Sequence, residues 1–243
     1  KKQGLDIRLG ARVTETRTTA AGVTVSYEDE RGQHSLDVDR LIVAVGRRPA
    51  SHGLLDPLAG VQLTERGFVA VDAECRTTAA NVWAVGDLVR GPMLAHKGSE
   101  EGVMVADLIA GRYGHVNYAA IPSVIYTSPE IAWVGQTEEQ LKEAGQSYKV
   151  GTFNFAASGR ARAMEQAAGL VKVLADAVTD RLLGVHIIGP MAGELIGEAV
   201  VAMEFEASAE DLQRTIHAHP TLAEAIHEAA LSADRRALHA INH

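Results

Sequence analysis

The sequence predicts an α+β fold in which a C-terminal domain, built on a mostly antiparallel sheet with flanking helices, follows the C-terminal parts of two α/β domains. Residues 6–46 are rich in short strand patterns, whereas strand and helix patterns are grouped together from about residue 117. Two uninterrupted apolar runs, residues 41–45 and 82–85, are typical of strands that are covered on both faces.

The bulk composition is that of a globular protein. The chain has 243 residues, of which 47% are hydrophobic and 22% charged, enough for a core in one or two domains. The net charge of −8 argues against nucleic acid as the main partner, and no apolar run approaches the roughly 18 residues that cross a membrane. The single cysteine, Cys75, excludes an internal disulfide and a cysteine-rich metal site. It fits a reducing compartment, and we expect a cytoplasmic protein with no membrane partner.

The first residues favour a fragment of a longer protein. Lys1, Lys2 and Gln3 read as the end of a helix that Gly4 stops, and the chain lacks an initiator methionine. An engineered start is the alternative.

Residues 6–46 read as strands joined by turns. Residues 23–27 alternate clearly between apolar and polar side chains, and residues 28–34 form a polar hairpin turn with Gly32. The apolar run at residues 41–45 is followed by Pro49, which breaks the strand pattern. We expect strands at residues 6–9, 12–17, 23–27 and 41–45.

The secondary-structure pattern of the rest of the chain changes twice. Residues 50–80 are irregular and rich in turns, and the strand predicted at residues 82–85 leads to a helix at residues 95–110 with Gly111 as its stop. Beyond them we expect strands at residues 149–155, 170–175 and 182–188, and helices at residues 137–144, 193–205 and 221–230.

Gly86 and Asp87 end the second apolar run. Ligands of open α/β sheets lie outside the carboxyl ends of strands, where Gly86 lets a ligand approach the backbone and Asp87 offers two acceptor oxygens to sugar or polyol hydroxyls. A strand that simply ends in a Gly-Asp turn is the alternative.

Residues 93–102 open the helix that follows. Its free N–H groups and dipole favour a ligand that carries negative charge, against which Met93 and Leu94 can pack. An acidic first turn that satisfies the dipole is the alternative.

His219 is the candidate acid/base residue. The spacing of Thr221 and Glu224 is that of a capping box, which explains both residues structurally. The same Glu224 can reach back to His219, fix its tautomer and make its other nitrogen a better base. A metal site at His217 and His219 lacks an obvious third ligand, and we predict no metal.

Taken together and in this order, the motifs resemble one family. Residues 45–49, 81–87, 93–102 and 217–224 resemble the C-terminal half of the flavin-dependent pyridine nucleotide–disulfide oxidoreductases. Residues 126–135 resemble the entry to the interface domain of that family, and residues 184–189 resemble its central strand. The runs at residues 93–97 and 217–222 are similar to the lipoamide branch.

The resemblance implies a domain layout and a dimer. Residues 1–48 correspond to the C-terminal part of an NAD-binding domain, residues 49–116 to the second segment of an FAD-binding domain, and residues 117–243 to the interface domain of a homodimer. The implied reaction is oxidation of a dihydrolipoyl group carried by a lipoyl domain of a 2-oxo acid dehydrogenase complex, with electrons passing to FAD and then to NAD.

The resemblance also implies residue roles. His219 acts as general base, oriented by Glu224, and reaches the active site of the partner subunit. Asp87 accepts a hydrogen bond from the ribityl chain of FAD. Other residues border the cofactors: Met93, Leu94, Ala95 and His96 line the flavin, and Val13 and Gly46 border the NAD.

Two departures limit this reading. The family needs a redox-active cysteine pair and glycine-rich dinucleotide fingerprints, but the chain has only Cys75 and no Gly-x-Gly-x-x-Gly. We therefore predict that this polypeptide alone is inactive. A glutathione reductase-like enzyme is the nearest alternative, and a mercuric reductase is disfavoured because the chain lacks a C-terminal cysteine pair. A non-catalytic dimerisation module is the alternative from another class.

Overall fold

The computed structural model describes residues 3–242 and divides the chain into two compact units, residues 1–48 and 49–243. The helix end predicted at the N-terminus starts with Lys1 and Lys2, which lie outside the described residues. Gly4 has the positive φ of 87° that such a stop requires.

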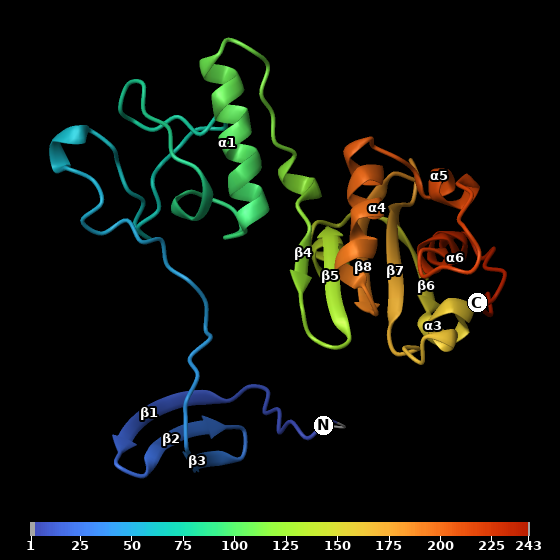
Figure 1. Cartoon of the computed structure of the whole chain (residues 1–243), viewed down its shortest axis with the longest axis horizontal. Helices are drawn as coiled ribbons and strands as arrows, with labels where there is room; N and C mark the ends of the chain where they lie inside the picture. The colour runs from blue at the N-terminus through green and yellow to red at the C-terminus, as the bar shows by residue number, and fades with distance from the viewer. Residues whose placement is uncertain (1–2, 243) are drawn as a thin grey trace. The chain divides into compact units, whose positions relative to one another are not determined.

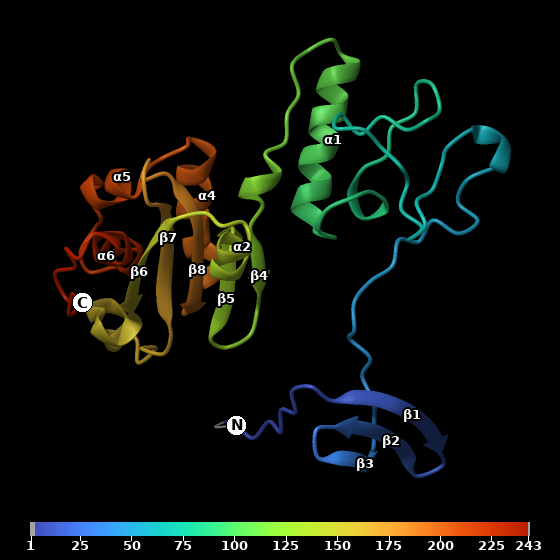
Figure 2. The same ribbon diagram turned by 180° about the vertical axis from the view of Figure 1, so that it is seen from behind.

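The first unit is a three-stranded antiparallel meander of β1 (Arg12–Thr19), β2 (Gly22–Asp29) and β3 (Gly32–Val38), shown in Figures 1 and 2. The alternation along β2 buries Val25 and Tyr27 and leaves Ser26 between them more exposed. The hairpin predicted around Gly32 is confirmed, and its turn lies between β2 and β3.

Two predicted strands of this unit are wrong. Residues 6–9 and 41–45 form no strand, and Ile42 and Val45 are 87% and 94% exposed. A strand forms only where a neighbouring strand completes its hydrogen bonds, and within the described residues no segment pairs with either run.

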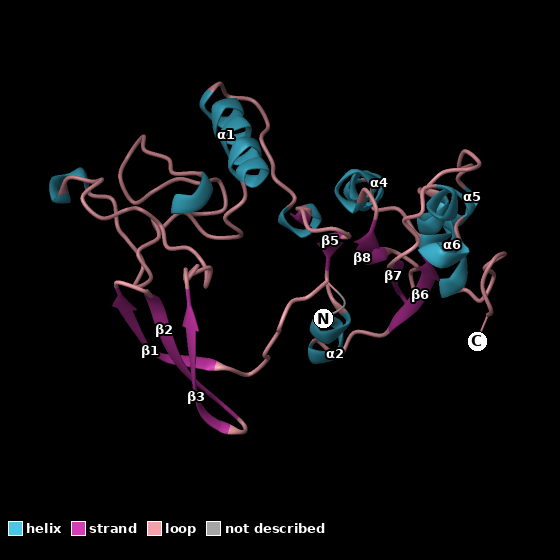
Figure 3. Cartoon of the chain, turned by 60° about the horizontal axis from the view of Figure 1, so that its bottom comes forward, coloured by secondary structure: helices cyan, strands magenta, loops and turns pink. Residues whose placement is uncertain are grey.

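Residues 49–94 are mostly loop, as Figure 3 shows, and hold the short 3₁₀ helices η1 (Pro57–Ala59) and η2 (Gly86–Leu88). The strand predicted at residues 82–85 is wrong, because the run makes only an isolated bridge between Trp83 and Arg76. The predicted helix is confirmed as α1 (Ala95–Ile109), and Gly111 follows it with a φ of 71°.

The rest of the second unit is built on a five-stranded antiparallel sheet with the strand order β4-β5-β8-β7-β6. β8 lies at its centre, between β5 and β7. Its strands are β4 (Ser123–Ile125), β5 (Glu130–Gly135), β6 (Tyr148–Asn154), β7 (Leu170–Asp176) and β8 (Leu182–Gly189). The α-helices are α2 (Glu138–Glu143), α3 (Gly159–Ala163), α4 (Ala192–Glu204), α5 (Ala209–Arg214) and α6 (Glu224–Ala233), with the 3₁₀ helices η3 (Tyr118–Ala120) and η4 (Phe155–Ala157).

Helices cover both faces of this sheet. α4 lies in front of the sheet in Figure 1 and α2 in front of it in Figure 2, so they lie on opposite faces. Alternate residues of the strands, such as Val173 and Val185, are fully buried and form one core with Ile196 of α4 and Ile226 of α6. Period-two burial of this kind is what packs a helix layer onto a sheet.

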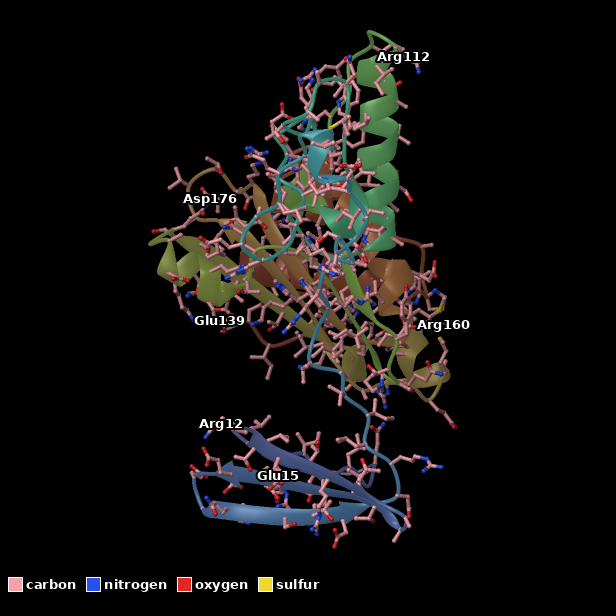
Figure 4. All side chains as sticks on the ribbon, turned by 90° about the vertical axis from the view of Figure 1, so that its left-hand side faces the viewer. Arg12, Glu15, Arg112, Glu139, Arg160 and Asp176 are labelled. Carbon is pink, nitrogen blue, oxygen red and sulfur yellow. The ribbon has the colours of Figure 1, made fainter. Side chains whose placement is uncertain are left out.

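The turn between β7 and β8 is closed by Asp176, which Figure 4 labels. Its Oδ1 accepts hydrogen bonds from the backbone N–H of Thr179 at 2.7 Å and of Val178 at 2.9 Å. Hydrogen bonds from Thr179, Gln146 and Val178 hold the pKa of Asp176 well below its usual value. This turn fixes the pairing of β7 with the central strand.

The structure confirms the α+β class and every helix and strand predicted beyond residue 137, with shifts at their ends. α6 begins three residues later than predicted, at Glu224. The prediction missed β4, β5, α3 and α5, which have six residues or fewer and little room for a periodic pattern. Among the described residues, no helix is both long and apolar enough to span a bilayer.

Candidate active site

His219 lies in the loop between α5 and α6 and is joined to Pro220 by a cis peptide bond. Glu224 is the first residue of α6, so the predicted spacing brings its carboxylate back over the loop. The Oε1 of Glu224 lies 2.8 Å from Nδ1 of His219. Because a carboxylate only accepts, Nδ1 carries the proton and Nε2 is left as the basic nitrogen.

The predicted capping box at Thr221 is only half formed. The backbone N–H of Thr221 donates to Oε2 of Glu224 at 2.7 Å, but the Thr221 hydroxyl donates to the carbonyl of Ala218 instead of accepting from the helix. The N-cap residue is Ala223, which makes no side-chain cap. Glu224 therefore serves the loop and the histidine at once, with one oxygen for each.

The carboxylate of Glu224 is held in its charged form. Burial raises the pKa of Glu224, but the hydrogen bonds from Thr221 N–H and from His219 lower it by a larger amount. The net pKa is therefore below its usual value. An ionised Glu224 stabilises the imidazolium that forms when His219 takes up a proton.

The imidazole of His219 opens onto solvent. Its side chain is 79% exposed, and no described residue forms a hydrogen bond with Nε2. His219 and Glu224 line an open cavity of about 560 Å³, together with Phe153, Ser158, His217 and His239. The basic nitrogen is thus accessible to a substrate from outside this chain.

His217 is built differently from His219. Its side chain is 6% exposed, and it donates from Nε2 to Glu198 at 2.7 Å and from Nδ1 to the carbonyl of Thr215 at 2.9 Å. The hydrogen bond to Glu198 raises the pKa of His217 despite its burial, because both ring nitrogens face acceptors. Its ring also stacks on His227 with centroids 5.0 Å apart. Both ring nitrogens of His217 are thus engaged by oxygen atoms of this chain.

A second glutamate–histidine pair on the cavity wall was not predicted. Glu228, one turn after Glu224 on α6, is 3% exposed and accepts a hydrogen bond from Nδ1 of His239 at 2.7 Å. It also accepts from the backbone N–H of Leu238 and of His239. The four-residue spacing of Glu224 and Glu228 is the only sequence signal for it.

The residues predicted to line a flavin lie together where η2 packs against α1. Asp87 lies in η2, Met93 and Leu94 precede α1, and Ala95 and His96 are its first two residues. His96 donates from Nε2 to the carbonyl of Pro122 at 2.8 Å. The N-cap residue Leu94 provides no side-chain cap, and the first turn of α1 has no acidic residue. The alternative of an acidic first turn is therefore wrong.

The chemistry of this region fits part of an FAD site. An exposed carboxylate at Asp87 suits polyol hydroxyls, and the uncapped N–H groups of α1 suit the negative charge of a reduced flavin. Gly86 has a φ of 75°, and a Cβ placed on Gly98 would lie 3.0 Å from the Cα of Gly86. Two glycines thus allow the loop to lie directly against the helix.

The residues predicted to border NAD lie in the first unit. Val13 is in β1 and is 58% exposed. Gly46 lies in the loop after residue 45, with a φ of 129° and open space where a Cβ would be. Both positions are open to solvent.

Two family models match the chain. Residues 121–230 match the dimerisation domain of the pyridine nucleotide-disulphide oxidoreductases, and residues 1–102 match a second model with the description pyridine nucleotide-disulphide oxidoreductase. The predicted family is confirmed by both matches.

Curated relatives and solved structures agree with these models. A dihydrolipoyl dehydrogenase from Cupriavidus necator is 54% identical over 98% of this chain and 50% of the relative. A dihydrolipoamide dehydrogenase from Chaetomium thermophilum is 51% identical over 98% of this chain and 48% of the relative. The flavoprotein disulfide reductase RclA from Escherichia coli has a TM-score of 0.82 and 32% identity, covering 94% of this chain and 52% of that chain.

The chain spans about half the length of the curated relatives it matches. Within that half, His219 is hydrogen-bonded to Glu224, and η2 packs against α1. The chain belongs to the pyridine nucleotide-disulphide oxidoreductase family, and it is similar to relatives named dihydrolipoyl dehydrogenase or dihydrolipoamide dehydrogenase.

Proposed function

We propose that the protein to which this chain contributes is a dihydrolipoyl dehydrogenase. It oxidises protein-bound dihydrolipoyl groups: the dithiol loses two electrons and two protons and becomes a disulfide, while NAD⁺ takes up a hydride and one proton is released. The dithiol–disulfide step needs a redox-active cysteine pair, which the family supplies and this chain does not contain.

The hydrogen bond between His219 and Glu224 carries this proposal. It leaves Nε2 of His219 basic and exposed, so this nitrogen takes the proton from a substrate thiol and produces the thiolate that attacks a disulfide. Glu224 holds the ring in place and stabilises its cationic form. His219 returns the proton when the leaving thiolate is protonated.

Asp87 and the residues at the start of α1 support FAD as the cofactor. When bound, FAD supplies the two-electron chemistry that links dithiol oxidation to NAD reduction. Asp87 would bind a hydroxyl of the ribityl chain, Met93 and Leu94 would pack against the ring, and Ala95 and His96 lie at the helix N-terminus that would face it. Val13 and Gly46 would border the NAD.

Cys75 is not part of the proposed redox centre. It is fully buried and is the only cysteine of the chain. An assay of the isolated polypeptide with added FAD, NAD and dihydrolipoamide should therefore show no turnover. Robust turnover would contradict this, and would leave the 243 residues as a complete catalyst.

We propose a homodimer that serves the lipoyl domains of a 2-oxo acid dehydrogenase complex in the cytoplasm. The match to a dimerisation domain supports the dimer, and so do large apolar side chains exposed in that part of the chain. The presence of a single cysteine in the chain supports a reducing compartment. The exposed apolar side chains include Met191, Val201, Phe205 and Ile216.

The proposal is tested with His219→Gln in the full-length protein. Dihydrolipoamide-dependent NAD reduction should fall by roughly 10²–10⁴ in kcat, because a general acid/base is lost, while the thermal midpoint stays unchanged. His115→Gln is the matched control, since this exposed histidine lies outside the cavity lining. An unchanged rate in His219→Gln would show that His219 is not the general acid/base and has a structural role.

Substrate preference separates the two enzyme readings. The full-length protein should turn over dihydrolipoamide and not reduce glutathione disulfide. The opposite preference would favour the glutathione reductase-like alternative.

A further inference from the structure

Two opposite charges are fully buried on α1. The side chains of Lys97 and Glu101 lie one helical turn apart, each 0% exposed, with Nζ of Lys97 3.1 Å from Oε2 of Glu101. Removing two charges from water is costly. A protein with well-packed apolar side chains in place of a buried ion pair is often as stable as the original or more stable. Stability of the fold alone therefore does not explain the pair.

The pair holds the backbone of one residue, Gly86. The Lys97 ammonium donates to the carbonyl of Gly86 at 2.8 Å and to the carbonyl of Arg90 at 3.1 Å, and its third proton faces Glu101. Oε2 of Glu101 accepts from the N–H of Gly86 at 2.7 Å. Both polar groups of Gly86 are thus held by charged side chains of α1, in hydrogen bonds that are stronger than those between neutral groups.

The second oxygen of Glu101 is also engaged. Tyr118 in η3 donates its hydroxyl to Oε1 of Glu101 at 2.8 Å, and the guanidinium of Arg90 lies over the Tyr118 ring at 5.1 Å. Burial and the hydrogen bond to Glu101 raise the pKa of Tyr118, so its hydroxyl stays a donor at neutral pH. Both oxygens of Glu101 are therefore held by hydrogen bonds, and one of them accepts the backbone N–H of Gly86.

The held loop and the helix carry the two parts of the proposed FAD site. Asp87 follows Gly86 directly, so the Gly86 peptide sets where its carboxylate lies. His96 directly precedes Lys97, so the same helical turn carries the residues proposed to line the flavin. Gly98 completes the contact, because the Cα of Gly86 leaves no room for a larger residue there without a shift.

We propose that Lys97 and Glu101 are positioning residues for FAD, which fix the Gly86–Asp87 backbone against the start of α1. This rests on the proposed function, since it takes the loop to be part of a flavin site. Neither residue touches the cofactor in this role. They act through the Gly86 backbone, so their loss changes how FAD binds before it changes any catalytic group.

The test uses the full-length apoprotein and a titration with FAD. Lys97→Met combined with Glu101→Leu removes both charges together, because removing one alone leaves the other buried and unpaired. The Kd for FAD should rise by about ten-fold or more, as expected for lost hydrogen bonds to charged groups, and the visible circular dichroism of the bound flavin should change. A Kd and a flavin spectrum identical to those of the wild type would overturn the proposal.

A second variant tests the loop without touching the charges. Gly98→Ala places a methyl group 3.0 Å from the Cα of Gly86 and favours the helix, so the fold is retained while the loop is displaced. It should also weaken FAD binding and alter the flavin spectrum. Gly102→Ala is the matched control, one turn further along α1 with nothing within 4 Å of the added methyl, and should bind FAD like the wild type. Equal binding by Gly98→Ala and Gly102→Ala would contradict the proposal if the double variant fails to fold.

A combination with Asp87→Ala shows whether the pair acts through the loop. If it does, the loss of FAD-binding free energy in the triple variant is smaller than the sum of the losses in the double variant and in Asp87→Ala. The reason is that both sets of substitutions disable the same contact. Additive losses would mean that the pair acts elsewhere. A wild-type protein that binds no FAD would instead refute the proposed function itself.

Discussion

Glu224 accepts a hydrogen bond from His219 with one carboxylate oxygen and from the backbone N–H of Thr221 with the other. The sequence offered two explanations for Glu224, a helix cap and an orienting partner for His219. The structure shows that one carboxylate does both, because its two oxygens point to different donors. The start of α6 and the orientation of the imidazole are therefore coupled through a single side chain.

This coupling predicts different results for two substitutions of Glu224. Glu224→Gln keeps an acceptor for Thr221 but loses the charge that stabilises the His219 imidazolium, so kcat should fall by about 10²-fold with little change in stability. Glu224→Ala should lower kcat as well and also cost about 1 kcal/mol in stability, because the loop N–H is left without its partner. Steady-state rates and thermal midpoints measured side by side check this, and equal midpoints for both variants would argue against the shared role.

The pair of His217 and Glu198 predicts a pH dependence of stability. The hydrogen bond to Glu198 raises the folded-state pKa of His217 above its usual 6.5, so the stabilisation is complete below that value and is lost as pH rises through the folded-state pKa. Glu198→Gln should therefore lower the thermal midpoint at about pH 5.5 and have little effect at about pH 8.5. A deficit that stays constant over this pH range would show that the charge on His217 is not involved.

A local pattern was enough to predict the longer helices and strands, but it did not show whether a strand-like run finds a partner. α1 was expected at residues 95–110 and is found at Ala95–Ile109, because a helix satisfies its hydrogen bonds within its own segment. The apolar run at residues 41–45 looks more regular, yet it forms no strand, because a strand depends on a neighbour that the described residues do not supply.

The same distinction holds for the site. His219 and Glu224 are five residues apart in one loop and helix start, so their spacing was enough to predict the contact. The partner of His217, Glu198, comes from α4 and has no signal in the sequence. Lys97 and Glu101 have the spacing of an ordinary exposed ion pair, and only the structure shows that they are buried against Gly86.

Packing of α6 on β6 predicts a steric effect at Gly151. A Cβ on Gly151 would lie 2.0 Å from the carbonyl oxygen of Ala229 and 2.4 Å from the backbone nitrogen of Ala233, and neither backbone atom can yield without moving the helix. Gly151→Ala should therefore destabilise the fold by about 1–3 kcal/mol. Gly197→Ala in α4 is the control, since it meets nothing within 4 Å and should not destabilise. Thermal midpoints of the two variants should separate clearly; if they coincide, α6 packs less closely than described.

The exposed apolar side chain of Ile216 predicts a link between dimerisation and activity. Ile216 is 97% exposed, three residues before His219, in the segment that matches a dimerisation domain. In the proposed homodimer, Ile216→Asp places a charge in an apolar contact, so the dimer dissociation constant should rise by about ten-fold or more. Specific activity should fall with it and recover as protein concentration is raised, because the proposed role of His219 lies in the partner's active site. Leu58→Asp is the matched control, with a residue that is 93% exposed but lies in η1, outside the dimerisation segment. Sedimentation and activity measured over the same concentration range decide the matter. If Ile216→Asp dissociates the dimer while activity per chain stays constant, His219 acts within its own subunit.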